Sequence, residues 1–457
     1  MRIRILILTV IAVALAGGVT VFAQGEAPSG GESPGIITGG VITPEIGAAP
    51  QIHKIPIAVP VFRDESETDG GDTARKLAEV LSDDMEMSGE FEVIDRARYL
   101  EDPRTAGVKA GEFEFANWSL IGAEYLIKSS FAKNGDQITM SLRLFNVLTQ
   151  QMRVGKEYNG SFEERFNMVH MFSREVFLEL FGDPGFFGSQ IAFASGTKDV
   201  REIYVMDADG RNRRRLTNLG LLAMSPKWSP NGKEILFAAQ GSTIQPTVFT
   251  VEVKTGKTKK VFTANSGVAL TPDWMPGGES FAVALSHDAN TEIYEVDLKG
   301  NIKRNMTKHW AIELAPAFGP NSSQMLFISD RSGAPQVYKI DIAGGDPSRI
   351  SFFGSYNQSP TWAKRGGKIA YSAREYGHYT IYLIDENGGE PYALTADMQP
   401  SCEYASFSPD GRILVFSCET SKGRAMWMRT TNDAYTRRLT QGTSFDTGPS
   451  WGPLPTE

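Results

Sequence analysis

The stretch Ser225-Pro226-Lys227-Trp228-Ser229-Pro230-Asn231-Gly232 decides the fold, because variants of it return at a nearly constant interval. In most variants a proline, any residue and an aromatic residue precede a turn rich in Pro, Asn, Asp and Gly. The aromatic positions are 46, 44, 44, 45 and 44 residues apart: Trp228, Trp274, Phe318, Trp362, Phe407 and Trp451. A fixed period of this length is the signature of a repeat architecture.

The residues between successive aromatics have the pattern of further strands. An apolar run such as Met325–Ser329 follows the turn, an alternating run such as Ile293–Asp297 comes next, and a short polar run such as Arg437–Thr440 ends the unit. Four short strands in 44–46 residues are typical of a β-propeller blade. Residues 190–217 lack the first strand of a blade and residues 446–453 supply one. We therefore expect a six-bladed propeller over 186–455, closed by the C-terminal strand, which leaves no open edge.

The residue three positions before each aromatic is expected to face the central channel of this propeller. These residues are Ser225, Thr271, Ala315, Ser359, Tyr404 and Gly448. They are candidate partner-binding residues, and packing within the blades is the alternative interpretation. The turn glycines Gly232 and Gly411 fit positions that need a positive φ.

Residues 51–183 predict an α/β domain, so the fold class is α+β with several domains. Ile55–Phe62 is a buried-strand run whose prolines favour an edge position. Amphipathic spacing predicts helices at Thr73–Glu86 and Ser161–Phe181. Four further strands are expected between the helices, the middle two joined by a turn at Asn134-Gly135: Phe91–Ile94, Tyr125–Phe131, Gln137–Val147 and Gln151–Tyr158.

The first residues resemble an export signal. Arg2 and Arg4 precede the apolar run Ile5–Ala16, and small residues follow up to Ala23. This order predicts a cleaved signal peptide at 1–23, with an apolar run too short to cross a bilayer. No cysteine lies near the cleavage site, so a lipid anchor is not expected. The mature protein is expected in an oxidising compartment, without a membrane span.

Residues 24–50 are rich in Gly, Pro, Ser and Ala, which predicts a flexible N-terminal arm. Within the arm, Ile36, Ile37, Val41 and Ile42 form a β-branched patch that could add as a strand to the sheet edge of a partner. A plain linker is the alternative.

Charge and motifs exclude several classes of function. The formal net charge of −8 argues against binding to nucleic acid. The chain has no nucleophile elbow, metalloprotease, P-loop or dinucleotide motif and no zinc-ligand spacing, so no catalytic residue, cofactor or metal is expected. The five histidines, among them His170, are expected on the surface or on a helix face. The basic run Arg211–Arg215 is either a solvated edge strand or an anion site.

Cys402 and Cys418 are the two cysteines, and they flank one predicted hairpin. With one bulge they would face each other across two strands. A disulfide and a pair of free thiols both remain open on this spacing.

Three further segments carry a family resemblance, together with the order of the two domains. They are Leu81–Phe91, Phe115–Leu126 and Gly185–Phe193. In combination with the propeller they resemble the TolB family over nearly the whole mature chain. Blade motifs alone are shared by many propellers, so the N-terminal domain gives the resemblance its specificity.

The resemblance implies a non-enzymatic, monomeric periplasmic component of the Tol-Pal system, which supports outer-membrane integrity and cell division. It implies that the lipoprotein Pal binds at the propeller channel and that TolA binds at the N-terminal arm, with Pal binding coupled to retraction of the arm. The chain departs from the family in two places: residues 24–34 lie between the signal and the expected TolA segment, and Leu314 and Ala315 stand where polar residues are common.

The rival interpretation is a periplasmic propeller enzyme or ligand sensor acting on peptides or glycans. A hydrolase of the prolyl-oligopeptidase type needs a separate Ser-Asp-His domain, for which the chain has no residues left. A sugar-cleaving propeller needs carboxylates converging on the channel, and the six positions listed above supply none.

Overall fold

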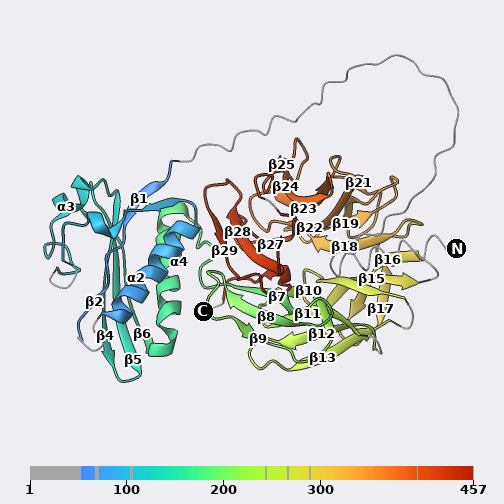
Figure 1. The fold of residues 1–457 in the computed structure, drawn as a ribbon, viewed down its shortest axis with the longest axis horizontal. Coiled ribbons are helices and arrows are strands. Elements are labelled where there is room, and N and C mark those ends of the chain that lie inside the picture. Colours follow the sequence, from blue (N-terminus) through green and yellow to red (C-terminus); the bar gives the residue numbers. More distant parts are fainter. Residues whose placement is uncertain are drawn as a thin grey trace, which may run out of the picture.

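The computed structural model describes residues 53–66, 71–102, 106–241, 244–264, 267–287, 290–398 and 400–455. These residues form two parts that lie side by side (Figure 1). A mixed α/β part comes first along the chain, and a larger part built from β-sheets follows. The expected signal peptide and N-terminal arm lie outside the described residues.

The first part is built on one sheet with the strand order β3-β1-β4-β5-β6, and β2 pairs with β4. β1 runs parallel to β3 and β4, whereas β4, β5 and β6 pair antiparallel. The strands are β1 (Ile55–Ala58), β2 (Arg63–Asp64), β3 (Phe91–Val93), β4 (Tyr125–Asn134), β5 (Gln137–Asn146) and β6 (Gln151–Ser161). The helices are α2 (Asp72–Met87), α3 (Phe115–Leu120) and α4 (Arg165–Phe181), with single 3-10 turns η1 (Arg96–Arg98) and η2 (Phe162–Glu164).

The two predicted helices and the strands between them are confirmed within a few residues, but the edge position expected for the first strand is wrong. β1 lies between β3 and β4. Ile57 is the partner of Tyr125, the first residue of β4, so Pro56 stands just before that ladder begins. The Pro56 carbonyl accepts a hydrogen bond from the Glu124 amide at 2.9 Å. A proline is tolerated here because its missing N–H falls outside the ladder.

The second part consists of sheets in the arrangement of a β-propeller, and their strands pair antiparallel apart from one parallel bridge between Leu222 and Arg201. Four sheets have four strands each, and one sheet of eight strands contains the first and the last strands of this part. The eight-stranded sheet holds β30 (Thr447–Trp451), β7 (Gln190–Gly196), β8 (Arg201–Asp207), β9 (Arg214–Arg215), β10 (Leu222–Trp228), β11 (Glu234–Gly241), β12 (Ile244–Glu252) and β13 (Thr258–Thr263).

The other four sheets follow in chain order. They are β14 (Ala269–Trp274), β15 (Ser280–His287), β16 (Asn290–Asp297) and β17 (Ile302–Asn305); β18 (Glu313–Phe318), β19 (Gln324–Ser329), β20 (Gln336–Asp341) and β21 (Ser348–Arg349); β22 (Tyr356–Trp362), β23 (Lys368–Glu375), β24 (His378–Asp385) and β25 (Tyr392–Ala393); and β26 (Cys402–Phe407), β27 (Ile413–Thr420), β28 (Gly423–Thr430) and β29 (Thr436–Arg438). In each sheet, the strand that ends in the repeated aromatic pairs with the next strand along the chain.

Cys402 and Cys418 are direct partners in the ladder between β26 and β27. Their Cα atoms are 4.1 Å apart, and a disulfide joins the two sulfur atoms. Both side chains are buried in the core of this sheet.

One hydrophobic core runs from the first part into the propeller. It joins apolar residues of α2 and α4, such as Leu77 and Phe177, to Phe186 and to propeller residues such as Ile413 and Trp451. His170 on α4 also faces this core rather than the solvent. Its Nδ1 lies 2.9 Å from Asp84 Oδ2 on α2. A buried charged pair of this kind compensates for the water that both groups lose.

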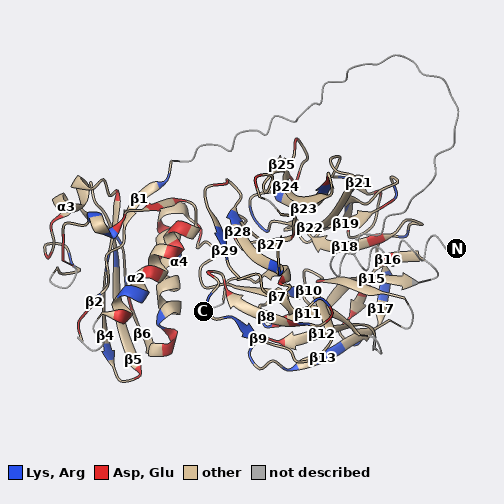
Figure 2. Ribbon diagram, viewed as in Figure 1, with Lys and Arg blue, Asp and Glu red and all other residues tan. Residues whose placement is uncertain are grey.

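Ion pairs between the two parts share one polarity. The propeller supplies the arginines and the first part, with its connecting segment, supplies the carboxylates (Figure 2). The pairs are Arg211–Asp83 (2.8 Å), Arg437–Asp83 (3.2 Å), Arg412–Glu90 (3.7 Å) and Arg365–Asp183. Arg211 is neither part of a solvated edge strand nor a free anion site, the two interpretations of the basic run 211–215. It forms ion pairs with Asp83 and Asp209 instead. Only Arg214 and Arg215 form the expected edge strand, β9.

Candidate functional site

The six residues predicted to face the channel share an unusual backbone conformation. Five of them are not glycine, yet all six have a positive φ. The values are Ser225 51°, Thr271 49°, Ala315 53°, Ser359 53°, Tyr404 60° and Gly448 60°. Residues with side chains adopt this left-handed region rarely, and when they do the strained positions cluster at functional sites.

A β-bulge produces this conformation in each of the six strands. The register between the inner strand and its neighbour shifts at the same place each time, for example between Met224 and Lys227 in β10 and between Leu314 and Ala317 in β18. A bulge inserts unpaired residues and redirects the side chains beside it. The repeat in sequence thus becomes a repeat in backbone geometry around the axis.

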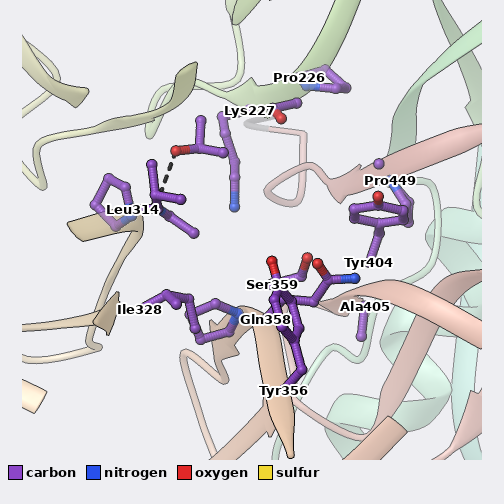
Figure 3. Close-up of a pocket in the computed structure, with 16 residues that line it drawn as sticks. Pro226, Lys227, Leu314, Ile328, Tyr356, Gln358, Ser359, Tyr404, Ala405 and Pro449 are labelled. Atoms are coloured by element: carbon purple, nitrogen blue, oxygen red, sulfur yellow. Dashed lines mark hydrogen bonds between the residues drawn. The ribbon is translucent and has the colours of Figure 1, made fainter. Parts of the chain in front are cut away.

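The six bulges converge on one pocket, which we call the mouth pocket (Figure 3). Its volume is about 90 Å³. All six predicted residues line it, next to prolines of the repeated motif such as Pro226 and Pro449. A hydrogen bond links two neighbouring blades at its wall, from the Ala315 amide to Thr271 Oγ1 at 3.0 Å. The structure therefore brings the predicted channel residues together.

The remaining wall of the mouth pocket is more apolar than the motif predicts. Leu314, Ile328 and Tyr356 line one side, and Gln358 lies beside them. Gln358 Nε2 donates to Glu403 Oε2 at 2.6 Å, so this amide is fixed by a buried carboxylate. A wall of apolar side chains, hydroxyls, one fixed amide and the ammonium group of Lys227 suits recognition of a protein surface better than bond cleavage.

The charged groups beneath Tyr404 are paired and buried. Arg424 Nη2 lies 2.9 Å from Glu403 Oε1. Burial raises the pKa of Glu403, and the charge of Arg424 opposes that shift. Burial also raises the pKa of the Tyr404 hydroxyl, with Glu403 adding to the effect. Tyr404 therefore stays neutral at the mouth pocket and can serve as a hydrogen-bonding and apolar contact.

Sequence reasoning missed several residues of the mouth pocket, among them Lys227, Ile328, Tyr356 and Gln358. Lys227 is the middle residue of the repeated motif, so the motif itself could have indicated it. Tyr356 and Gln358 begin an inner strand and carry no repeated signal. Ile36, Ile37, Val41 and Ile42, the predicted contacts of the arm, lie outside the described residues.

Among the described residues, no group of three or more His, Cys, Asp or Glu side chains could hold a metal ion. Among the described helices, none is long and apolar enough to cross a membrane.

Comparisons with known proteins agree on one family. The family model described as "TolB beta propeller domain" matches residues 177–455, and the one described as "TolB amino-terminal domain" matches residues 48–153. A Tol-Pal system protein TolB from Desulfosudis oleivorans is 35% identical over 260 residues, which are 56% of this chain and 58% of that protein. The corresponding protein from Syntrophotalea carbinolica is 34% identical over 163 residues, 36% of this chain and 38% of that protein. The chain thus spans about half the length of the curated relatives it matches, or less.

Among solved structures, TolB from Acinetobacter baumannii has the same fold. The match has a TM-score of 0.74 at 24% identity and covers 90% of this chain and 99% of that one. Together with the two family models, which match most of the sequence, this fold leads to a plain assignment: the chain belongs to the TolB family.

Proposed function

We propose that the protein is a non-enzymatic component of the Tol-Pal system that binds Pal at the mouth pocket and TolA through residues 24–50. The observation that carries the proposal is the convergence of six positive-φ backbone positions, five of them strained because they are not glycine, on one pocket in a member of the TolB family. Such strain costs about 1–2 kcal/mol at each non-glycine position, and its repetition around the axis favours a binding role over blade packing alone.

We infer the following organisation of the chain: a signal peptide at 1–23, a flexible arm at 24–50, an α/β domain at 51–183 and a six-bladed propeller at 186–455. The eight-stranded sheet supports the blade count, because a single bridge between Leu222 and Arg201 joins its two halves. Antiparallel pairing of β30 with β7 supports closure by the C-terminal strand. We infer that the mature protein is periplasmic and monomeric. The predicted signal peptide supports export, and the disulfide between Cys402 and Cys418 fits an oxidising compartment.

The experiment separates the two binding sites. Full-length mature chain and a variant lacking 24–50 are each tested for binding to purified Pal and to purified TolA. We expect the deletion to abolish TolA binding and to leave Pal binding intact. If the deletion abolishes binding to both proteins, or leaves TolA binding intact, Pal and TolA do not bind at the two separate sites proposed here.

A second variant tests the mouth pocket. Ser359→Arg places a long charged side chain in a pocket of about 90 Å³, so Pal affinity should fall at least tenfold while TolA binding persists. Ser323→Arg, in an exposed turn of another blade, is the matched control and should bind both partners. If the two variants bind Pal with equal affinity, the mouth pocket is not the binding site of Pal.

A further inference from the structure

Two positions before each positive-φ residue of the mouth pocket lies a residue whose place we call the clamp position. The residues at the six clamp positions are all fully buried: Ala223, Ala269, Glu313, Asn357, Cys402 and Asp446. In each blade, the last residue paired before the register shift of the bulge directly follows the clamp position. The clamp position is therefore where each inner strand is held in place before its bulge begins.

The six clamp positions differ in how their side chains are held. Alanine occupies two of them, where the side chain can form no bond. Side-chain hydrogen bonds hold three others; Glu313, for example, accepts from Ser329 Oγ at 3.2 Å. Cys402 is held by a covalent bond, the disulfide to Cys418. The two alanine blades show that neither the blade nor a positive φ requires a bond at this position.

The disulfide lies directly before the residues of β26 that build the mouth pocket. Glu403 follows Cys402 in the strand, and the next two residues, Tyr404 and Ala405, line the mouth pocket (Figure 3). Cys402 and Cys418 themselves are buried and do not line it. An effect of the disulfide on a ligand of the mouth pocket must therefore pass through the position of the strand.

Two consecutive residues of β26 depend on that position. Glu403 is the one ionisable residue among the six that directly follow a clamp position, and it is buried. Its ion pair with Arg424, at 2.9 Å, offsets the cost of burial only while the geometry is kept. Tyr404 has the bulkiest side chain of the six positive-φ residues, and bulky residues rarely adopt this conformation. Its amide donates to Ser372 Oγ of the neighbouring blade at 3.3 Å, a contact that a shift of the bulge would break.

We propose that the disulfide between Cys402 and Cys418 is a positioning device for the mouth pocket. It holds the start of β26 against β27, so that Tyr404 keeps its left-handed conformation at the pocket wall. This step rests on the contacts given above. Its consequence, that Pal affinity depends on the disulfide, rests in addition on the proposed function.

Two variants of the full mature chain replace the disulfide with side-chain pairs that the propeller already contains. Cys402→Ala/Cys418→Ala reproduces the alanine pair that joins β10 to β11. Cys402→Ala/Cys418→Leu reproduces the alanine–leucine pair that joins β14 to β15, and it fills the space left by the sulfur atoms. Gly411→Ala is the matched control, because it disturbs the turn at the other end of the β26–β27 hairpin and leaves the disulfide in place. Thermal melting shows whether each variant folds.

Hydrogen exchange of backbone amides tests the position of the strand without any ligand. Both disulfide variants should exchange at least tenfold faster than the wild type over residues 403–407, because the bulge opens more often. Residues 224–228 of β10 should exchange as in the wild type, which separates local loosening from a general loss of stability. Unchanged exchange over 403–407, or an equal increase over both segments, overturns the proposal.

Calorimetric titration with purified Pal tests the consequence for binding. Pal affinity should fall at least fivefold in both disulfide variants and should stay within twofold of the wild type in Gly411→Ala. A merely structural disulfide predicts instead that folded variants bind Pal alike. Unchanged affinity in the disulfide variants, or an equal loss in Gly411→Ala, therefore overturns the proposal.

The remaining outcomes separate the bond from other causes. If the wild type does not bind Pal, the proposed function fails and hydrogen exchange alone decides about the disulfide. If only Cys402→Ala/Cys418→Ala differs from the wild type, the empty space and not the lost bond is responsible, and the proposal is wrong. If neither disulfide variant folds, the disulfide is a requirement of the fold, and the proposal is wrong as well.

Discussion

At the scale of single residues, the positive φ of the non-glycine residues around the mouth pocket should lower the free energy of unfolding by a measurable amount. Ala315 has a φ of 53°, and its side chain is a single methyl group, so replacement by glycine changes little besides the backbone preference. Ala315→Gly should raise the free energy of unfolding by about 0.5–1 kcal/mol, since relief of the strain exceeds the entropy that glycine gains in the unfolded chain. Urea denaturation measures the change.

Ala317→Gly is the matched control for this prediction. Ala317 lies two residues further along β18, is buried and is not among the residues with positive φ. The same substitution should lower the free energy of unfolding there by about 1 kcal/mol. Destabilisation of similar size at both positions would show that Ala315 is not strained.

His170 gives the second prediction at this scale. Burial alone would lower the pKa of its imidazole, but the Asp84 carboxylate outweighs burial and the pKa rises to about 8. Because the folded value lies above the unfolded value near 6.5, the protonated pair stabilises the fold below pH 6.5. This contribution, about 2 kcal/mol, is lost as the pH rises through 8.

Chemical denaturation between pH 6 and pH 9 tests the His170 pair. The wild type should lose about 2 kcal/mol more than His170→Gln over this interval. His53→Gln changes an exposed histidine and should keep the wild-type pH dependence. Parallel curves for wild type and His170→Gln would contradict the assignment.

The sequence predicted part of this residue-scale picture. The constant spacing placed six residues at one end of the channel, because identical blades repeat identical positions. The left-handed conformation was not predictable, since Ser, Thr, Ala and Tyr give no local signal for positive φ. Burial of His170 was also missed, because its partner Asp84 lies on another helix, 86 residues away in the sequence.

At the scale of elements, the turns between first and second strands of the blades are similar in sequence but differ in their surroundings. Gly411 and Gly366 both have positive φ, 75° and 82°. A Cβ on Gly411 would lie 2.2 Å from the Arg365 carbonyl oxygen, whereas a Cβ on Gly366 would meet no atom within 4 Å. Gly411→Ala should therefore cost about 3–4 kcal/mol of unfolding free energy and Gly366→Ala about 1–2 kcal/mol.

Urea denaturation of the two alanine variants distinguishes the contributions. The loss of unfolding free energy that both variants share comes from placing alanine at a positive φ. The additional loss in Gly411→Ala comes from the contact with the neighbouring blade. Equal costs would mean that the turn at Gly411 moves away from Arg365 without loss.

Helices and strands with a regular spacing of apolar residues could be predicted from the sequence. Elements whose form or position depends on contacts with other elements could not. The two long helices follow from their apolar spacing. The short helix α3 has one buried residue, Trp118, and therefore no periodic pattern. The interior position of β1 depends on where β4 begins, which no feature of Ile55–Ala58 indicates.

At the scale of the whole molecule, charge complementarity fixes how the first part sits on the propeller. Asp83 on α2 accepts from two arginines, Arg211 and Arg437, that come from opposite ends of the propeller sequence. Composition could not predict this contact, because a basic run in an acidic chain gives no information about its partner. Because the shared core also crosses the boundary, we expect both parts to unfold together.

Asp83→Asn tests this arrangement. Loss of the carboxylate leaves two partly buried arginines without their shared acceptor, so the free energy of unfolding should fall by about 1–2 kcal/mol, with a smaller effect in high salt. Asp72→Asn is the matched control on the same helix. Asp72 pairs with Arg75 and Lys76 at an exposed end, so its loss should change the free energy of unfolding much less than Asp83→Asn does. A double-mutant cycle with Arg211→Met then isolates the contact, and a coupling energy near zero would show that the apolar core alone holds the two parts together.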